Sequence, residues 1–249
     1  VVVALREGDT IVTGSHDRTL RVWDTTNGAH LRTFTGHGAP LSEGAWMAGG
    51  DVVTASWQYE SAEDLEATPA LIRWSPANGR ERVRCEGHTD WIRGVAPLGA
   101  ERVLTWSDDG DLRIWDASTG ECGATLSGHE ASVRGGAPVD EQQWLSWSED
   151  ATIRLWDLSS PRCVAVFEVE GSWIAGAAAL ADGTLSAWTD ASEGAAVVRI
   201  WDRRESTARF ALSHGDHEVQ SVAAGNGRVW VWYADGPIAS WDAVSPASE

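Results

Sequence analysis

One stretch of 30 residues recurs along the chain, and this repetition constrains the fold more than any other feature. Gly87–Asp116 reads GHTDWIRGVAPLGAERVLTWSDDGDLRIWD, and Gly128–Asp157 reads GHEASVRGGAPVDEQQWLSWSEDATIRLWD, 41 residues later. Each copy opens with Gly-His and closes with Trp-Asp. Between these ends lie short β-rich runs separated by Gly/Asp turns, a pattern typical of antiparallel strands joined as a meander. In the first copy we expect strands over 91–98, 102–107 and 112–115.

Further copies are recognised by their closing tryptophans, which are Trp23, Trp74, Trp115, Trp156, Trp201 and Trp241. A period near forty residues with Gly-His and Trp-Asp ends is the signature of a propeller blade. In these residues the sequence resembles the WD-repeat β-propeller family, over nearly the whole chain. The resemblance implies an all-β fold, a β-propeller of about six four-stranded antiparallel blades of which the first and last are incomplete.

The repeats place the blades at approximately 1–35, 36–86, 87–127, 128–169, 170–212 and 213–249. The first blade lacks its Gly-His segment, and only AVSPASE follows Asp242, which is too short and polar for a good outer strand. We therefore expect the sequence to be a piece of a larger chain. A seven-bladed ring that shares its last blade with further sequence is as consistent with the pattern as a six-bladed one.

Composition narrows the classes of partner. The formal charge of −18 argues against nucleic acid and anionic membranes, because both require a basic face. The longest apolar run, 173–181, is far shorter than the ~20 residues of a membrane span. All 19 basic residues are arginine, which suggests a GC-rich, bacterial source. We interpret Cys85, Cys122 and Cys163 as reduced thiols of a cytoplasmic protein.

A group of polar residues in the third repeat has the composition of a catalytic triad: His88, Ser107, Asp109 and Trp115. The same spacing recurs one repeat later, in His129, Ser148, Asp150 and Trp156. An active site is seldom built once per blade, whereas a structural network is. The resemblance implies hydrogen-bonded tetrads that give each buried tryptophan N–H an acceptor. Whether Thr105 or Ser107 supplies the hydroxyl in the third blade stays open.

Two departures from the repeat affect packing. Gln58 stands in the second blade where the tetrad has its aspartate, so that tetrad is incomplete. Trp106 and Trp147 stand where the first blade has Gly14, and we expect their large apolar area to fill the gap between blades.

A meander returns to the same end at every second connection, so the Gly-His connections and the turns between second and third strands share one face. The resemblance implies that this face binds partners. Its candidate residues are Trp91, Arg93, Asp108, Arg134, Glu149 and Trp173. Tryptophan and arginine dominate interface energies, although Trp91 and Trp173 are equally consistent with burial between blades.

An acidic insertion, 58–70, extends the second blade on the same face. It carries Glu60, Glu63 and Asp64. A run of like charges is usually a solvated loop, and the alternative interpretation is a contact arm for a basic partner.

These features favour a non-catalytic protein–protein interaction scaffold that binds a protein or peptide and needs no cofactor. The alternative from another class is a propeller enzyme, or a lectin for a small ligand or glycan, that uses the central channel. Either would need a group of acids, histidines or metal ligands that is not repeated. The sequence contains no HExxH, CxxC, glycine-rich phosphate loop or nucleophile elbow, so we predict no catalytic residues and no metal site.

Overall fold

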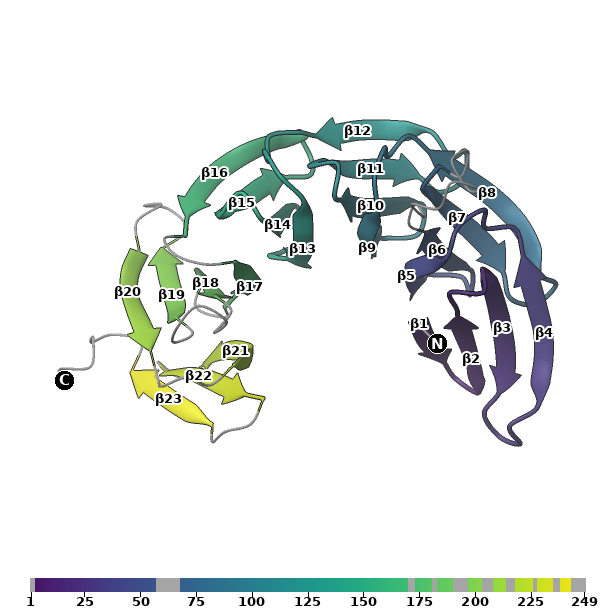
Figure 1. Cartoon of the computed structure of the whole chain (residues 1–249), viewed down its shortest axis with the longest axis horizontal. Helices are drawn as coiled ribbons and strands as arrows, with labels where there is room; N and C mark the ends of the chain where they lie inside the picture. Colours follow the sequence, from purple (N-terminus) through teal and green to yellow (C-terminus); the bar gives the residue numbers. More distant parts are fainter. Residues whose placement is uncertain are drawn as a thin grey trace. The chain divides into compact units, whose positions relative to one another are not determined.

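The structure is a computed structural model. It describes residues 3–56, 68–169, 173–180, 183–189, 197–202, 208–213, 218–225, 228–234 and 238–242. These residues form 23 strands and no helix, and the strands pair in six antiparallel sheets (Figure 1). The all-β fold of propeller-type blades predicted from the repeats is therefore confirmed. The predicted contact arm with Glu60, Glu63 and Asp64 lies outside the described residues.

The chain divides into two compact units, Val1–Val133 and Arg134–Glu249. The first unit contains the sheets β1-β2-β3-β4, β5-β6-β7-β8 and β9-β10-β11-β12. Their strands are β1 (Val3–Glu7), β2 (Thr10–Gly14), β3 (Thr19–Asp24), β4 (His30–Thr35), β5 (Leu41–Trp46), β6 (Val52–Ser56), β7 (Ala70–Ser75), β8 (Arg80–Glu86), β9 (Ile92–Leu98), β10 (Arg102–Ser107), β11 (Leu112–Asp116) and β12 (Cys122–Leu126). The first blade thus has four strands, although its Gly-His segment is missing from the sequence.

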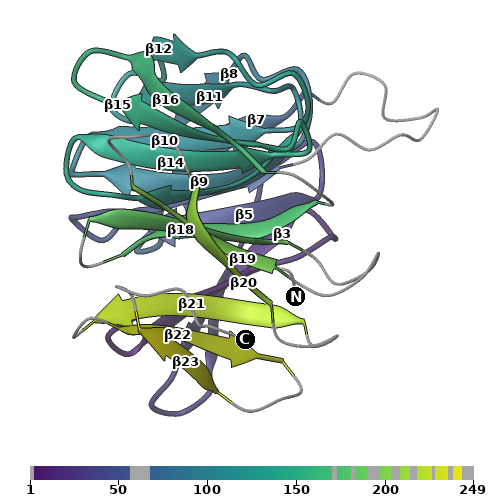
Figure 2. The same ribbon diagram turned by 90° about the vertical axis from the view of Figure 1, so that its left-hand side faces the viewer.

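The second unit contains two four-stranded sheets, β13-β14-β15-β16 and β17-β18-β19-β20, and the three-stranded sheet β21-β22-β23 (Figure 2). Their strands are β13 (Val133–Pro138), β14 (Gln143–Ser148), β15 (Thr152–Asp157), β16 (Arg162–Glu168), β17 (Ile174–Ala179), β18 (Thr184–Thr189), β19 (Val197–Asp202), β20 (Ala208–Ser213), β21 (Val219–Gly225), β22 (Arg228–Tyr233) and β23 (Ala239–Asp242). Within the described residues the last sheet has no fourth strand, as expected for an incomplete blade.

The repeat extends to an irregularity of the backbone. In five sheets the register between the third and fourth strands shifts immediately before the closing tryptophan, which is Trp23, Trp74, Trp115, Trp156 or Trp201. Such a bulge bends the strand and increases its twist locally. Each of these blades therefore turns its outer strand at the same point of the repeat.

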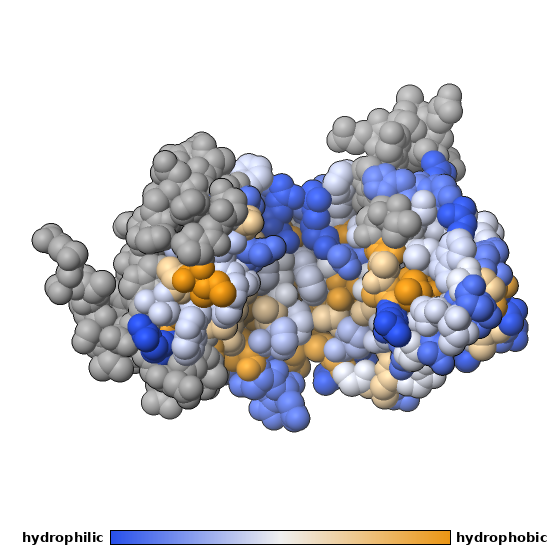
Figure 3. Space-filling model, turned by 90° about the horizontal axis from the view of Figure 1, so that it is seen from below, coloured by the Kyte–Doolittle hydropathy of each residue, from blue (hydrophilic) through white to orange (hydrophobic). Residues whose placement is uncertain are grey.

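Apolar side chains form the core between successive sheets of each unit. In the first unit, Leu20 and Phe34 belong to the same buried cluster as Ile72 and Trp74 of the next sheet. In the second unit, Leu145 and Phe167 share a cluster with Leu185 and Trp201 in the same way. The visible described surface instead shows short apolar patches separated by polar residues (Figure 3).

A second tryptophan in the third, fourth and fifth blades lies over a glycine of the neighbouring first strand. A Cβ added to Gly94 would lie 1.9 Å from the Trp106 ring, and one added to Gly135 would lie 2.1 Å from the Trp147 ring. Trp188 covers Gly176 in the fifth blade in the same manner. These rings therefore occupy space within their own sheet, which was not expected. Trp147 also packs against the buried cluster that joins the fourth and fifth blades, in agreement with the expected packing between blades.

Candidate functional site

The polar group of the third blade forms a connected chain of hydrogen bonds. Trp115 Nε1 donates to Thr105 Oγ1 at 2.8 Å, and His88 Nε2 lies 2.7 Å from the same oxygen. His88 Nδ1 in turn lies 2.7 Å from Asp109 Oδ2. His88, Thr105 and Trp115 are buried, so the chain gives their side-chain polar atoms partners where water does not reach.

The structure identifies Thr105, and not Ser107, as the hydroxyl of this chain. Alternation along a strand would place both side chains on one face, but the β9–β10 register shifts between Trp106 and Ser107, and Ser107 makes other contacts. Its Oγ donates to Asp90 O at 2.9 Å and accepts from Asp109 N at 3.1 Å. The assignment of Ser107 to the tetrad was therefore wrong, and this serine instead fixes the turn that presents Asp109.

The same correction applies to the fourth blade. Trp156 Nε1 donates to Ser146 Oγ at 2.8 Å, and Ser146 precedes Ser148 by two residues. Ser148 Oγ accepts from Asp150 N at 3.1 Å, as its counterpart does in the third blade. Asp150 Oδ1 accepts from the backbone and hydroxyl of Thr152 at 2.8 and 2.7 Å. His129 is buried.

The tryptophan–hydroxyl bond is shared by further blades. Trp23 donates to Thr13 at 2.9 Å, and Trp74 donates to Thr54 at 2.9 Å. A bond that recurs from blade to blade supports a structural role, because each of these buried or part-buried indoles has one N–H group that needs an acceptor.

The second blade shows what happens where the aspartate is replaced. His37 Nε2 lies 2.7 Å from Thr54 Oγ1, but the buried Nδ1 has no hydrogen-bond partner among the described residues. Burial, with a smaller contribution from the charge of Arg84, lowers the pKa of His37 to about 3. In the third blade, burial raises the pKa of Asp109. The hydrogen bond and charge of His88, together with hydrogen bonds from the backbone N–H groups of Thr89 and Asp111, outweigh this effect and lower the pKa to about 2.

The aspartate of the closing Trp-Asp pair caps the turn to the fourth strand. Asp116 Oδ1 accepts from the backbone N of Ser118 at 2.7 Å and from that of Thr119 at 3.1 Å. Asp24 and Asp157 accept from Thr26 and Ser159 in the same way. Sequence reasoning used this residue only as a marker of the repeat, although an aspartate that bonds the backbone two residues later is a known turn signal.

In the first unit, three of the predicted partner-binding residues meet in one cluster. Arg93 Nε donates to both carboxylate oxygens of Asp108, at 2.8 and 2.9 Å. The guanidinium carbon lies 4.4 Å from the centroid of the Trp91 ring, and Trp91 is half-buried. Asp108 N also donates to Trp91 O at 2.9 Å, so the turn between β10 and β11 is tied to the start of β9.

In the second unit, the remaining three predicted residues form the equivalent cluster. Arg134 Nε donates to Glu149 Oε1 at 2.8 Å, and its guanidinium carbon lies 5.4 Å from the Trp173 ring. Arg134 therefore reaches the tryptophan of the next blade, whereas Arg93 covers the tryptophan of its own. Trp173 is 61% exposed, which decides between the two interpretations of this residue.

The described residues hold no group of three or more histidine, cysteine or acidic side chains that could bind a metal ion. Within the same residues, no helix is long and apolar enough to cross a membrane.

The fold and the repeated polar chains define a class of protein, the repeat proteins built of propeller blades. Within this class, the family described as WD domain, G-beta repeat (WD40) matches residues 4–24, 79–116 and 120–157. These three segments are similar to the repeats of the WD-repeat family. A computationally designed protein, Ika8, matches with a TM-score of 0.77 and 21% identity over 97% of this chain and 70% of its own, and it supports the fold alone.

Curated relatives carry the repeats within longer chains. WD repeat-containing protein pop1 of Schizosaccharomyces pombe is 30% identical over 46% of this chain and 20% of its own length. Nuclear distribution protein PAC1-2 of Uncinocarpus reesii is 30% identical over 47% of this chain and 37% of its own. The Ribosome biogenesis protein WDR12 homolog of Drosophila persimilis is 33% identical over 47% of this chain and 27% of its own length. The chain thus spans less than two fifths of each relative, and these eukaryotic proteins do not support the expectation of a bacterial source.

Proposed function

We propose that the chain is a non-catalytic scaffold that binds a protein or peptide on the face that bears the Gly-His connections and the turns between second and third strands. The observation that carries this proposal is Trp173. An indole that is 61% exposed leaves a large apolar surface in water, and the protein gains little stability from it. A protein partner that covered this surface would convert the exposed area into binding energy.

The arginine–carboxylate pairs support the proposal because they fix the aromatic rings beforehand. Arg134 stacks near Trp173 while Glu149 holds its guanidinium, and Arg93 and Asp108 act on Trp91 in the same manner. A side chain ordered before binding loses less conformational entropy when the partner arrives. The formal charge of −18 favours a partner with basic groups at its rim, and we expect the protein to act in the cytoplasm.

The competing function is an enzyme or a lectin with a site in a propeller channel. Its strongest candidate group, His88 with Asp109, is engaged with Thr105 and the indole of Trp115. His88 is 3% exposed, so a substrate would have to displace a satisfied, buried network to reach it. This geometry favours the scaffold.

The experiment replaces Trp173 with the photo-crosslinking residue p-benzoylphenylalanine and irradiates the full chain in lysate. The same residue at Leu31 is the matched control, because Leu31 is an apolar side chain of similar exposure, 52%. The proposal predicts that a protein is crosslinked by the residue at position 173 and not by the residue at position 31. The same protein should be lost from pulldowns with a Trp91→Ala, Arg93→Ala, Trp173→Ala variant that retains the β-sheet circular dichroism of the wild type. Equal crosslinking at both positions would contradict it, and stabilisation by a glycan or metal ion in a thermal-shift panel would support the alternative.

A further inference from the structure

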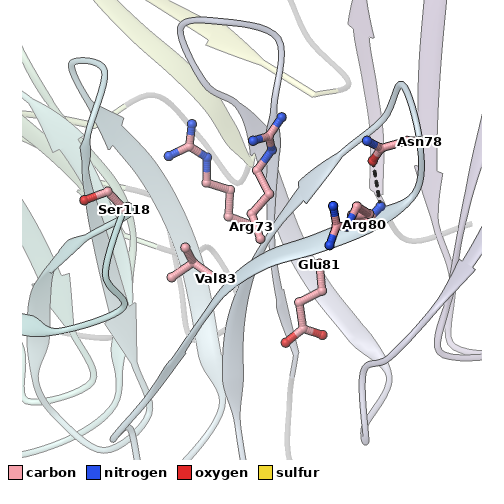
Figure 4. Close-up of a pocket in the computed structure, with 7 residues that line it drawn as sticks. Arg73, Asn78, Arg80, Glu81, Val83 and Ser118 are labelled. Atoms are coloured by element: carbon pink, nitrogen blue, oxygen red, sulfur yellow. Dashed lines mark hydrogen bonds between the residues drawn. The ribbon is translucent and has the colours of Figure 1, made fainter.

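An arginine-rich cavity lies in the first unit, at the opposite ends of the strands from the Gly-His connections. It has a volume of about 440 Å³ and is lined by Arg73, Asn78, Arg80, Glu81, Arg82, Val83 and Ser118 (Figure 4). β7, β8 and the turn between them supply six of these residues, and Ser118 comes from the turn after β11. None of them belongs to the surface proposed above to bind a protein.

Opposite charges inside this group only partly cancel. The buried carboxylate of Asp51 accepts a hydrogen bond from Arg73 Nε at 2.8 Å and forms an ion pair with Arg82, whose Nε lies 3.0 Å away, so one acid serves two arginines. Glu81 is held by Arg84, whose Nε and Nη2 donate to it at 2.9 and 2.8 Å. The Glu81 carboxylate points away from the Arg73 guanidinium (Figure 4). Asp116, which accepts from the lining residue Ser118, is a third acid at this site. Four arginines against three acids leave a local charge of +1 in a chain whose formal charge is −18.

The three lining arginines have different tasks. Arg73 ties two blades together, because its Nη1 donates to Ala117 O at 3.1 Å while its Nε binds Asp51. Arg82 uses only Nε in that pair, its side chain is 52% exposed, and its two Nη groups remain for a ligand. Arg80 is exposed and makes no ion pair among the described residues. The cavity therefore has one structural arginine and two with donors to spare.

We propose that this cavity binds a phosphate monoester group through Arg80 and Arg82. A guanidinium offers paired N–H donors in a planar fork that matches phosphate oxygens, and an anionic group suits a site whose local charge is positive. The amide of Asn78 adds a neutral donor, since its Oδ1 is the atom that accepts from Arg80 N at 3.0 Å. Ser118 does not add one, because its hydroxyl already donates to Asp116.

The overall charge determines which phosphates fit. At physiological ionic strength, charges beyond about 8 Å are largely screened, so a single phosphate experiences the local arginines more than the distant acids. A long polyanion would extend beyond this region and be repelled by the acidic surface. The ligand class is thus an isolated phosphate group, carried by a small molecule or by a phosphorylated side chain.

The test is isothermal titration calorimetry of the full chain with three probes. They are inorganic phosphate, a peptide in which one phosphoserine is flanked by uncharged residues, and the same peptide with aspartate in place of the phosphoserine. We expect both phosphate probes to bind, and the phosphoserine peptide to bind at least about tenfold more tightly than the aspartate peptide. If the phosphoserine peptide binds with much higher affinity than inorganic phosphate, the ligand is a phosphorylated side chain. If the two affinities are equal, the ligand is a small phosphorylated molecule. Equal binding of the aspartate and phosphoserine peptides, or no binding of phosphate, would overturn the proposal.

Variants localise the binding. Arg80→Gln should weaken phosphate binding about tenfold, since one charge-assisted pair is lost, and Arg82→Gln should do the same. Arg162→Gln is the matched control, because Arg162 stands at the same register of the fourth strand, opposite Asp157 as Arg80 is opposite Ser75. Should Arg82→Gln disturb folding by releasing Asp51, Arg80→Gln alone decides. Unchanged binding in Arg80→Gln, or an equal loss in Arg162→Gln, would contradict the assignment.

Discussion

At the scale of single residues, the hydroxyl two positions before the predicted serine determines how the blade satisfies its buried polar atoms. Thr105→Val should lower the free energy of unfolding by about 2–4 kcal/mol, because the indole N–H of Trp115 and the Nε2 of His88 would both lose their partner. Ser107→Ala should cost less, about 1–2 kcal/mol, since its bonds to Asp90 O and from Asp109 N are lost but the indole and His88 keep their partner. Urea denaturation followed by tryptophan fluorescence measures both, and the reverse order would restore Ser107 as the tetrad member.

The glycine beneath Trp106 makes a steric prediction. Gly94→Ala should destabilise the protein by about 1–3 kcal/mol, because the new methyl group would occupy the position of the indole ring. Gly123→Ala is the control, since its nearest atom would be an ordinary 3.6 Å away. The double variant Gly94→Ala, Trp106→Leu should recover part of the loss in a double-mutant cycle. Strict additivity of the two substitutions would show that the ring does not rest on this glycine.

The buried histidine of the second blade makes stability depend on pH. Because the pKa of His37 is about 3 in the folded chain and 6.5 without the fold, the unfolded state binds more protons between these values. The free energy of unfolding should therefore fall as pH decreases from 6.5, by up to ~1.4 kcal/mol per pH unit from this residue. His37→Gln should flatten the slope between pH 7 and pH 5 in denaturant titrations. The exposed His30→Gln serves as control, and an unchanged slope in His37→Gln would refute the interpretation.

At the scale of elements, each turn from third to fourth strand is organised by the aspartate of its Trp-Asp pair. Hydrogen bonds from Ser118 and its backbone N–H hold the pKa of Asp116 below 3.8, so this contribution is present at neutral pH and is lost as the carboxyl is protonated in acid. We expect Asp116→Ala to lower the melting temperature more than Asp116→Asn, which retains an acceptor oxygen. The same pair of substitutions at exposed Asp9, whose carboxylate accepts no hydrogen bond from the described residues, should show no such difference. Equal differences at both positions would contradict turn capping by Asp116.

The strands and turns also show which parts of the fold and of the candidate site can be predicted from the sequence. The strands of the third blade follow from its turn residues, and the structure begins β9 and ends β11 within one residue of the predicted limits. The choice between Thr105 and Ser107 could not be made from the sequence, because both are small hydroxyl residues that strand alternation places on one face. A register shift between Trp106 and Ser107, which the sequence does not reveal, separates them. The contact of Arg134 with Trp173 joins two blades, and its spacing in the sequence differs from that of Arg93 and Trp91. No periodic pattern predicts such a contact.

At the scale of the whole molecule, repetition separates what stabilises the chain from what is available for recognition. The tryptophan–hydroxyl bonds recur in four blades and are buried in three of them and part-buried in the first, so we assign them to stability. Among the described residues, the strong exposure of Trp173 and the pair formed by Arg80 and Arg82 are not repeated at the equivalent positions of other blades, and we propose that they serve binding. A basic cavity in an acidic chain was missed by sequence analysis because net charge averages over all blades, whereas Arg80 and Arg82 act locally.

The measurement that tests the central claim most directly is the affinity of the full chain for the protein crosslinked from position 173. Trp173→Ala should raise its dissociation constant at least about tenfold, because aromatic anchors carry a large share of interface energy. Leu31→Ala should leave the constant unchanged, and both variants should unfold at the wild-type urea concentration. An unchanged dissociation constant for Trp173→Ala, or an equal loss for Leu31→Ala, would contradict the claim that this exposed tryptophan is where the scaffold binds.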